Sequence, residues 1–339
     1  MFILASKKAQ YRGAIGSAVF SSALFSSALF SSTLFSGARL SGLPLLGCIL
    51  FSGLASSPLH ADETRRCVMD DRNREVCLSA PAQRIAALSP GATELTYAAG
   101  AGNQVVAVVS YSDYPPQAQQ VESVGSHTRV DLEALVGLTP DLVIGWVTGN
   151  PTEQMETLEA LGMPVFYIEP RTVEAVAGTI ERLATLAGTE AAGQEVADNF
   201  RDGMTALAAE YSGREPVRTF YQVWDQPLMS VNNEHLIGQV ISLCSGENVF
   251  GDQGRLVPRL DDEAVLMANP DAILAGGMGE ENRHWLTHWE QYTNLNAVAS
   301  DSLYFVPPSL IQRPTPRLLE GTQLLCEKLE QTRQKRKDS

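Results

Sequence analysis

The chain has 339 residues, of which 44% are hydrophobic and 19% are charged, a balance typical of a globular protein. This length is enough for two ordinary domains and excludes a small disulfide-stabilised peptide. Because 39 acidic residues stand against 25 basic ones, we do not expect the chain to bind the phosphate backbone of a nucleic acid.

The first 61 residues differ in composition from the rest. They contain basic residues but no acidic one, and they include two long uncharged stretches. A basic start followed by apolar residues is typical of an export signal. We interpret residues 1–61 as a signal peptide cleaved after Ala61, which places the folded part outside the cytoplasm. The alternatives are a lipoprotein acylated at Cys48, in the Leu-Leu-Gly-Cys segment at 45–48, and an uncleaved membrane anchor.

Four cysteines remain beyond Cys48, which favours an oxidising compartment. Residues 62–83 contain two short strand patterns around an Asp/Asn turn, so we expect a hairpin whose ends meet. This predicts a disulfide between Cys67 and Cys77. Cys244 and Cys326 either close a long loop through a second disulfide or remain buried thiols.

Short apolar runs alternate with helical patterns over residues 84–171. Strands are expected at 85–88, 105–109, 141–146 and 165–168, and helices at 92–99, 131–138 and 152–161. This alternation predicts an α/β lobe with a parallel sheet.

Residues 172–212 show helical spacing throughout, interrupted only at Gly188 and Thr189. The part at 190–211 spans roughly 33 Å at 1.5 Å per residue, enough to cross a domain. Alternation then restarts, with strands at 218–223 and 272–275 and helices at 236–244, 262–267 and 283–291.

We therefore predict two α/β, Rossmann-like lobes with largely parallel sheets, at 84–171 and 213–330. A long rigid helical connector at 172–212 joins them, and a polar tail occupies 331–339. A ligand cleft is expected between the lobes, at the carboxyl ends of the strands.

Five segments of the first lobe form a specific set of motifs. They are 84–100 (RIAALSPGATELTYAAG), 110–116 (SYSDYPP), 124–126 (VGS), 131–135 (DLEAL) and 139–144 (TPDLVI). Together they resemble the periplasmic substrate-binding proteins of ABC importers for cobalamin, haem and ferric siderophores, over nearly all of residues 84–328. The resemblance implies a receptor rather than an enzyme, little closure on binding, and delivery of the ligand to an ABC transporter permease in the inner membrane.

Three further segments are similar to the cobalamin-binding type of this family. They are 144–150 (IGWVTGN), 243–250 (LCSGENVF) and 312–317 (QRPTPR). The resemblance implies cobalamin, or a related corrinoid, as the transported ligand of a monomer with no resident cofactor or metal. It also puts Cys244 and Cys326 at two half-cystine positions.

A corrinoid is a broad, flat, mostly apolar disc edged with amides, which needs aromatic faces and a few hydrogen-bond donors. The candidate ligand-binding residues are Tyr111, His127, Trp146, Trp224, Asp225 and Arg313. Trp146 could instead pack in the core, and Arg313 could be an ordinary exposed arginine. His127 stands where the cobalamin-binding type has a tryptophan. It could coordinate cobalt, ligate a haem iron or make ordinary polar contacts.

Two glutamates have a different expected role. Glu133 and Glu263 each stand near the start of a predicted helix, one in each lobe. The resemblance matches them to a pair that docks on arginines of the permease. A glutamate in a first helical turn is also favoured by the helix dipole alone.

A metal-dependent hydrolase outside the cytoplasm is the alternative from another class. His284 and His288 are four residues apart and would share one face of a helix, as zinc ligands do. Trp285 and Trp289 have the same spacing, which favours a simple amphipathic helix. Neither a Gly-x-Ser-x-Gly elbow nor a phosphate-binding loop motif occurs. We expect no enzyme, with haem and ferric siderophore as the alternative ligands of the receptor.

Overall fold

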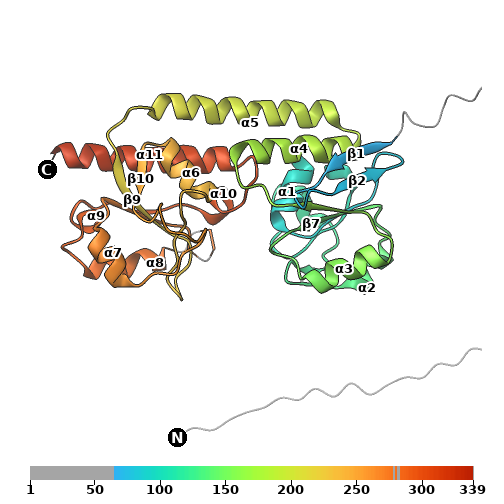
Figure 1. Cartoon of the computed structure of the whole chain (residues 1–339), viewed down its shortest axis with the longest axis horizontal. Helices are drawn as coiled ribbons and strands as arrows, with labels where there is room; N and C mark the ends of the chain where they lie inside the picture. The colour runs from blue at the N-terminus through green and yellow to red at the C-terminus, as the bar shows by residue number, and fades with distance from the viewer. Residues whose placement is uncertain (1–64, 278, 281–282, 339) are drawn as a thin grey trace, which may run out of the picture. The chain divides into compact units, whose positions relative to one another are not determined.

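The protein is described by a computed structural model that covers residues 65–277, 279–280 and 283–338 (Figure 1). The predicted signal peptide, its cleavage site and Cys48 lie outside the described residues. Within the described part of the chain, no helix is both long and apolar enough to cross a membrane.

A β-hairpin opens the described chain. Strand β1 (Arg66–Met69) pairs antiparallel with β2 (Glu75–Leu78), and Cys67 lies directly opposite Cys77. The Asp70 carboxylate accepts hydrogen bonds from the backbone of Arg72 and Arg74, both at 2.9 Å, and so holds the turn. The predicted Cys67–Cys77 disulfide is present.

The first lobe is built on a four-stranded parallel sheet with the order β4-β3-β7-β8. Its strands are β3 (Ile85–Ala87), β4 (Val105–Ala107), β7 (Leu142–Trp146) and β8 (Val165–Ile168), and its helices are α1 (Pro90–Ala98), α2 (Leu132–Gly137) and α3 (Thr152–Ala160). Short elements complete it: η1 (Gly102–Gln104), η2 (Pro116–Gln120) and the hairpin β5 (Gly125–Ser126) with β6 (Arg129–Val130). Ile85 and Ala87 enter one buried cluster and Ala86 another, so the sheet is covered on both faces.

The second lobe repeats this plan with a parallel sheet in the order β10-β9-β11-β12. Its strands are β9 (Val217–Gln222), β10 (Gly246–Asn248), β11 (Ala272–Ala275) and β12 (Leu303–Phe305). Its helices are α6 (Leu236–Leu243), α7 (Asp262–Ala268), α8 (His284–Thr287), α9 (Asn296–Ala299), α10 (Pro308–Ile311) and α11 (Leu318–Asp338), with η3 (Trp289–Gln291). The second disulfide, Cys244–Cys326, fastens the end of α6 to α11.

Helices α4 (Val173–Ala187) and α5 (Glu190–Tyr211) form the connector. Gly188 ends α4 in the left-handed conformation, with φ of 73°, which glycine adopts without a steric penalty. Helix α5 packs on α4 and contacts α1 of the first lobe and both α6 and α11 of the second (Figure 1). Ala197, Phe200 and Met204 of α5 belong to one buried cluster that extends into both lobes. The connector is therefore part of a continuous core, which makes the link between the lobes stiff.

The helix predicted at 283–291 is the first of two corrections in the second lobe. This helix is broken, because α8 ends at Thr287 and η3 follows with tighter turns. That break accompanies the burial of Trp289, whose indole Nε1 donates a 2.9 Å hydrogen bond to Gln222 of β9.

The predicted polar tail at 331–339 is not a tail over residues 331–338, which continue α11. Arg333 is 2% exposed, and its guanidinium donates to the backbone carbonyls of Glu215 at 2.6 Å and Cys244 at 2.7 Å. These bonds satisfy a buried charged side chain and hold the last turns of α11 against the lobe.

Candidate functional site

A cavity of about 680 Å³ lies between the two lobes. It is lined by residues at the carboxyl ends of five parallel strands: Ser89 after β3, Trp146 of β7, Glu169 after β8, Trp224 after β9 and Gly277 after β11. Loops at these strand ends form the usual ligand site of open α/β sheets, and the volume suits a small-molecule site. The structure thus places a cavity where the sequence predicted a cleft.

Five of the six predicted ligand-binding residues line this cavity: Tyr111, His127, Trp146, Trp224 and Arg313. Trp146 is half-buried in the cavity wall and does not pack in the core. Tyr111 is 76% exposed and has a φ of 67°, rare for a large side chain. Trp224 is 42% exposed and meets Trp285 edge to face, with ring centroids 6.0 Å apart. Aromatic surface therefore faces the cavity from both lobes.

Asp225 is the exception among the predicted residues. It does not line the cavity, and its carboxylate accepts a 3.3 Å hydrogen bond from Gln222. Asp225 is the first residue of the turn that follows Trp224, between the paired residues Trp224 and Met229. Both residues were expected to open towards the cleft, and of the two only Trp224 lines the cavity.

Asn150 braces the first-lobe wall and was not among the predicted site residues. It is 6% exposed, its Oδ1 accepts from the Trp146 backbone N–H at 2.6 Å, and its Nδ2 donates to the carbonyls of Leu88 and His127, both at 2.9 Å. One buried amide thus ties together three segments of the wall: the end of β7, the end of the β3 segment and the tip of the β5–β6 hairpin. Asn150 lies between a glycine and a proline after an apolar strand, a pattern that indicates a turn. The pattern does not indicate which groups the Asn150 side chain bonds.

His235 is a second cavity residue that the sequence analysis missed. Its Nδ1 caps the start of α6 by accepting from the Ile237 backbone N–H at 3.1 Å. Burial, together with the positive charge of Arg171, lowers the pKa of His235 to about 4. The imidazole is therefore neutral near pH 7, with its proton on Nε2.

Arg313 was predicted either to contact the ligand or to be an ordinary exposed arginine, and in the structure its guanidinium is bonded to the first lobe. Its Nη1 donates to Glu94 at 2.8 Å and to Asp113 at 2.9 Å, and its Nη2 donates to the Tyr111 carbonyl at 3.3 Å. All three acceptors belong to the first lobe, whereas Arg313 belongs to the second. The arginine lines the cavity, but most of its charge is already compensated by the first lobe.

Glu94 of α1 is the centre of this contact between the lobes. Its side chain is 2% exposed and also accepts from Thr315 at 2.9 Å and from Arg317 at 2.7 and 3.0 Å. The helix predicted at 92–99 has Glu94 in its first turn. In the structure α1 begins earlier, at Pro90, with Ser89 accepting from the Ala92 N–H as its cap. Glu94 therefore turns inward, where it joins the lobes through charge-assisted hydrogen bonds.

Glu133 and Glu263 lie outside the cavity at equivalent places in the two lobes. Each is exposed in the first turn of a short helix, α2 or α7, capped two residues earlier by Asp131 or Asp261. Among the residues that the structure describes, neither carboxylate has a hydrogen bond or an ion pair. Figure 1 shows α2 and α7 on the side of the lobes opposite α5.

The two histidines of the hydrolase alternative are not arranged as a metal pair on one helix. His288 follows the end of α8, and its Nε2 lies 2.7 Å from the Asp262 carboxylate. The grouping of potential metal ligands found in the described chain is Cys67, Glu75 and Cys77. Its two sulfurs form a disulfide, so they are not available as thiolates.

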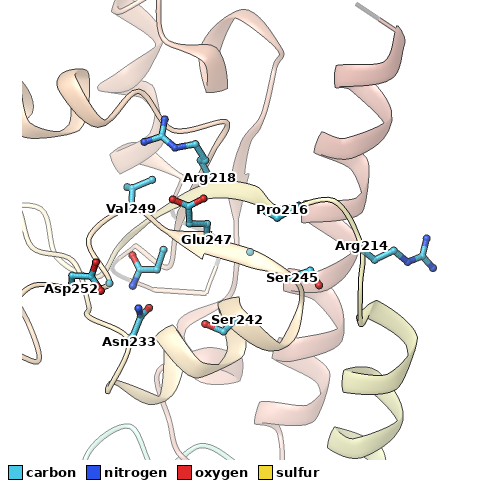
Figure 2. A pocket seen from close by; sticks show the side chains of 12 residues that line it. Arg214, Pro216, Arg218, Asn233, Ser242, Ser245, Glu247, Val249 and Asp252 are labelled. Carbon is cyan, nitrogen blue, oxygen red and sulfur yellow. The ribbon is translucent and has the colours of Figure 1, made fainter.

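A second hollow, of about 530 Å³, lies beside the edge strand β10 of the second lobe (Figure 2). None of the predicted ligand-binding residues lines it. Its two arginines have partners within the fold: Arg214 lies 3.7 Å from Glu330, and Arg218 donates to the Asn269 carbonyl at 3.1 Å. The cavity between the lobes is therefore the stronger candidate site.

Known proteins are similar to this chain in sequence. The model of the periplasmic binding protein family matches residues 85–310. A vitamin B12-binding protein of Vibrio cholerae is 36% identical over 246 residues, which cover 73% of this chain and 88% of that protein.

Solved structures are similar as well. The crystal structure of the periplasmic vitamin B12 binding protein BtuF of Vibrio cholerae matches with a TM-score of 0.68 and 34% identity, covering 75% of this chain and 98% of that one. The periplasmic haem-binding protein HutB of Vibrio cholerae matches with a TM-score of 0.65 and 22% identity over 73% of this chain and 98% of that one. Because HutB is only 22% identical to this chain, its similarity shows the fold alone.

Proposed function

The chain belongs to the periplasmic binding protein family, and we propose that it is a receptor that binds cobalamin, or a related corrinoid, between its lobes. It then delivers this ligand to the permease of an ABC transporter in the inner membrane. The observation that carries the proposal is the cavity at the carboxyl ends of both sheets, with Trp146 on one wall and Trp224 on the other. The vitamin B12-binding relatives support the same ligand.

The walls suit a large planar guest. Tyr111, Trp146 and Trp224 offer aromatic surface to the apolar ring of a corrinoid. Ser309 and Gln312 also line the cavity and can serve the amides at the ring's edge. The shared core along α5 and the Glu94 contacts hold the lobes in place, so the cavity is formed before the ligand arrives. A preformed site loses little conformational freedom on binding.

Delivery is assigned to the opposite side of the lobes from α5. Glu133 and Glu263 carry exposed, unpaired charges, one on each lobe, and we assign them to basic residues of the permease. Such paired charges orient a complex and speed its formation more than they raise its affinity. Residues 1–61 are assigned to export, with acylation of Cys48 as the alternative.

Calorimetric titration of the purified protein with cyanocobalamin tests the proposal. We expect one corrinoid per chain, with a shift of the corrinoid absorption bands. A matched control is Met267→Ala, which removes an apolar side chain that is 88% exposed and outside the cavity, and which should leave binding unchanged. Absence of both heat and a band shift at high micromolar concentrations would contradict the proposal.

Haem is the second candidate ligand, and His127 is the observation that favours it. Its imidazole lines the cavity, and neutral imidazole binds iron well. Parallel titrations with haemin and cyanocobalamin decide between the two. One-to-one binding of haemin, together with a failure of cyanocobalamin to bind, would replace the corrinoid with haem.

A further inference from the structure

We propose that His127 is a metal ligand of the receptor, which bonds to the cobalt of the bound corrinoid and favours corrinoids whose upper ligand is exchangeable. This inference rests on the proposed function, because it requires a corrinoid in the cavity. It adds a specificity that aromatic contacts alone do not provide.

The backbone fixes His127 at the edge of the cavity. Gly125 pairs with Val130 and Ser126 with Arg129, so His127 and Thr128 form the two-residue tip of the β5–β6 hairpin. The His127 carbonyl accepts a 2.9 Å hydrogen bond from the buried Asn150 amide, which anchors that tip to the wall. The side chain is half-buried and lines the cavity. A ligand held by a braced hairpin is pre-positioned for its metal.

The imidazole of His127 has no competing partner in the described part of the chain. Neither ring nitrogen makes a hydrogen bond or an ion pair there, and the neighbouring hydroxyls of Ser126 and Thr128 bond to each other at 3.2 Å. The His127 ring contacts the ring of Trp146. The centroids of these two rings are 5.7 Å apart, and their planes make an angle of 43°. The two rings are tilted, so His127 does not extend Trp146 as a flat stacking surface. The lone pair of an imidazole nitrogen lies in the plane of its ring. Because the two rings are tilted, the lone pair of His127 points out of the plane of the Trp146 indole.

The other cavity histidine is a control within the same molecule. Nδ1 of His235 already accepts the Ile237 N–H at the start of α6, so its proton is on Nε2. A protonated ring nitrogen has no lone pair to offer a metal. His127 is therefore the cavity histidine whose ring nitrogens remain available for coordination.

The proposed step is a ligand exchange without a change of oxidation state. In aquocobalamin, the water on the upper face of Co(III) leaves with the electron pair of its Co–O bond. The lone pair of the neutral His127 imidazole forms the new Co–N bond, and no proton moves. Cyanide binds Co(III) much more tightly than water does, so cyanocobalamin keeps its upper ligand and binds through contacts with the walls alone.

Absorption spectra and affinities of the full protein with aquocobalamin and cyanocobalamin test the inference. With aquocobalamin, the wild-type protein should give the spectrum of an imidazole-bound cobalamin. His127→Gln should abolish this spectrum and weaken aquocobalamin binding relative to cyanocobalamin by about tenfold or more. His235→Asn keeps an acceptor at the helix cap and should retain the spectrum.

Each outcome has a definite meaning. An unchanged spectrum of bound aquocobalamin in His127→Gln, or its loss in His235→Asn alone, would overturn the role of His127 while leaving corrinoid binding intact. Failure of the wild-type protein to bind either corrinoid would overturn the proposed function, and this inference with it.

Discussion

Replacing Glu94 with glutamine perturbs the contact between the lobes at a single atom. The carboxylate, 2% exposed, accepts from Arg313, Thr315 and Arg317, all from the second lobe. Glutamine has nearly the same shape but no charge. Its amide NH2 group donates hydrogen bonds, so it would face hydrogen-bond donors of the second lobe without an acceptor. The variant therefore leaves two partly buried guanidinium groups facing a neutral side chain.

The expected cost follows from the environment of these groups. Removing one partner of a buried ion pair typically costs about 3 to 5 kcal/mol. Arg313 keeps Asp113 at 2.9 Å, and the side chains of Arg313 and Arg317 are 19% and 17% exposed, so we take the lower end, about 3 kcal/mol. A domain of this size loses about 2 to 4 °C in Tm per kcal/mol, which gives a decrease of about 6 to 12 °C.

Thermal unfolding followed by circular dichroism measures this decrease. Glu133→Gln is the matched control, because it removes the charge of an exposed glutamate and should change the stability by less than about 0.5 kcal/mol. If Glu94→Gln does not fold, Thr315→Val removes one neutral donor from the same carboxylate and should cost about 1 kcal/mol. Equal Tm values for Glu94→Gln and Glu133→Gln would refute the view that these bonds stiffen the contact between the lobes.

Three other predictions concern the ligand, pH and delivery. Trp146→Ala should weaken cyanocobalamin binding by about 1 to 3 kcal/mol in calorimetry, and an unchanged affinity would place the ring away from the ligand. Because the folded-state pKa of His235 is about 4, below an unfolded value near 6.5, its stabilisation is complete above about pH 6.5. That stabilisation, at most about 3 kcal/mol, is lost as the pH falls towards 4, so His235→Asn should reduce the difference in Tm between about pH 7 and pH 5. An equal difference in both proteins would contradict the burial argument. Glu133→Ala combined with Glu263→Ala should preserve binding but slow transport in a reconstituted system, whereas loss of binding would assign both acids to the ligand.

The sequence predicted most of the strands that are continuous apolar runs, but it did not predict β12, whose sequence is Leu-Tyr-Phe. Strands β7 and β8 are such runs, since hydrophobic residues fill both faces of a covered parallel sheet. Strand β10, with the sequence Gly-Glu-Asn, has no apolar run and was not predicted. This strand is three residues long and lies at the edge of the sheet. It forms because it pairs with β9, so its conformation depends on the tertiary structure rather than on the local sequence.

The site could be predicted in part for a similar reason. Tyr111, Trp146 and Trp224 were found because aromatic residues after strands point to a strand-end cavity. Glu94 and Arg313 could not be paired, because 219 positions separate them and nothing local marks either as a partner. Local patterns thus located the cavity, whereas the side chains that hold it together required the three-dimensional structure.

A crystal structure of the protein with cyanocobalamin tests the central claim most directly. We expect one corrinoid in the cavity between the lobes, in contact with Trp146 on one side and Trp224 on the other, with both lobes placed as they are here. A corrinoid bound elsewhere, for example in the hollow beside β10, or a cavity filled by side chains of the two lobes, would contradict the account.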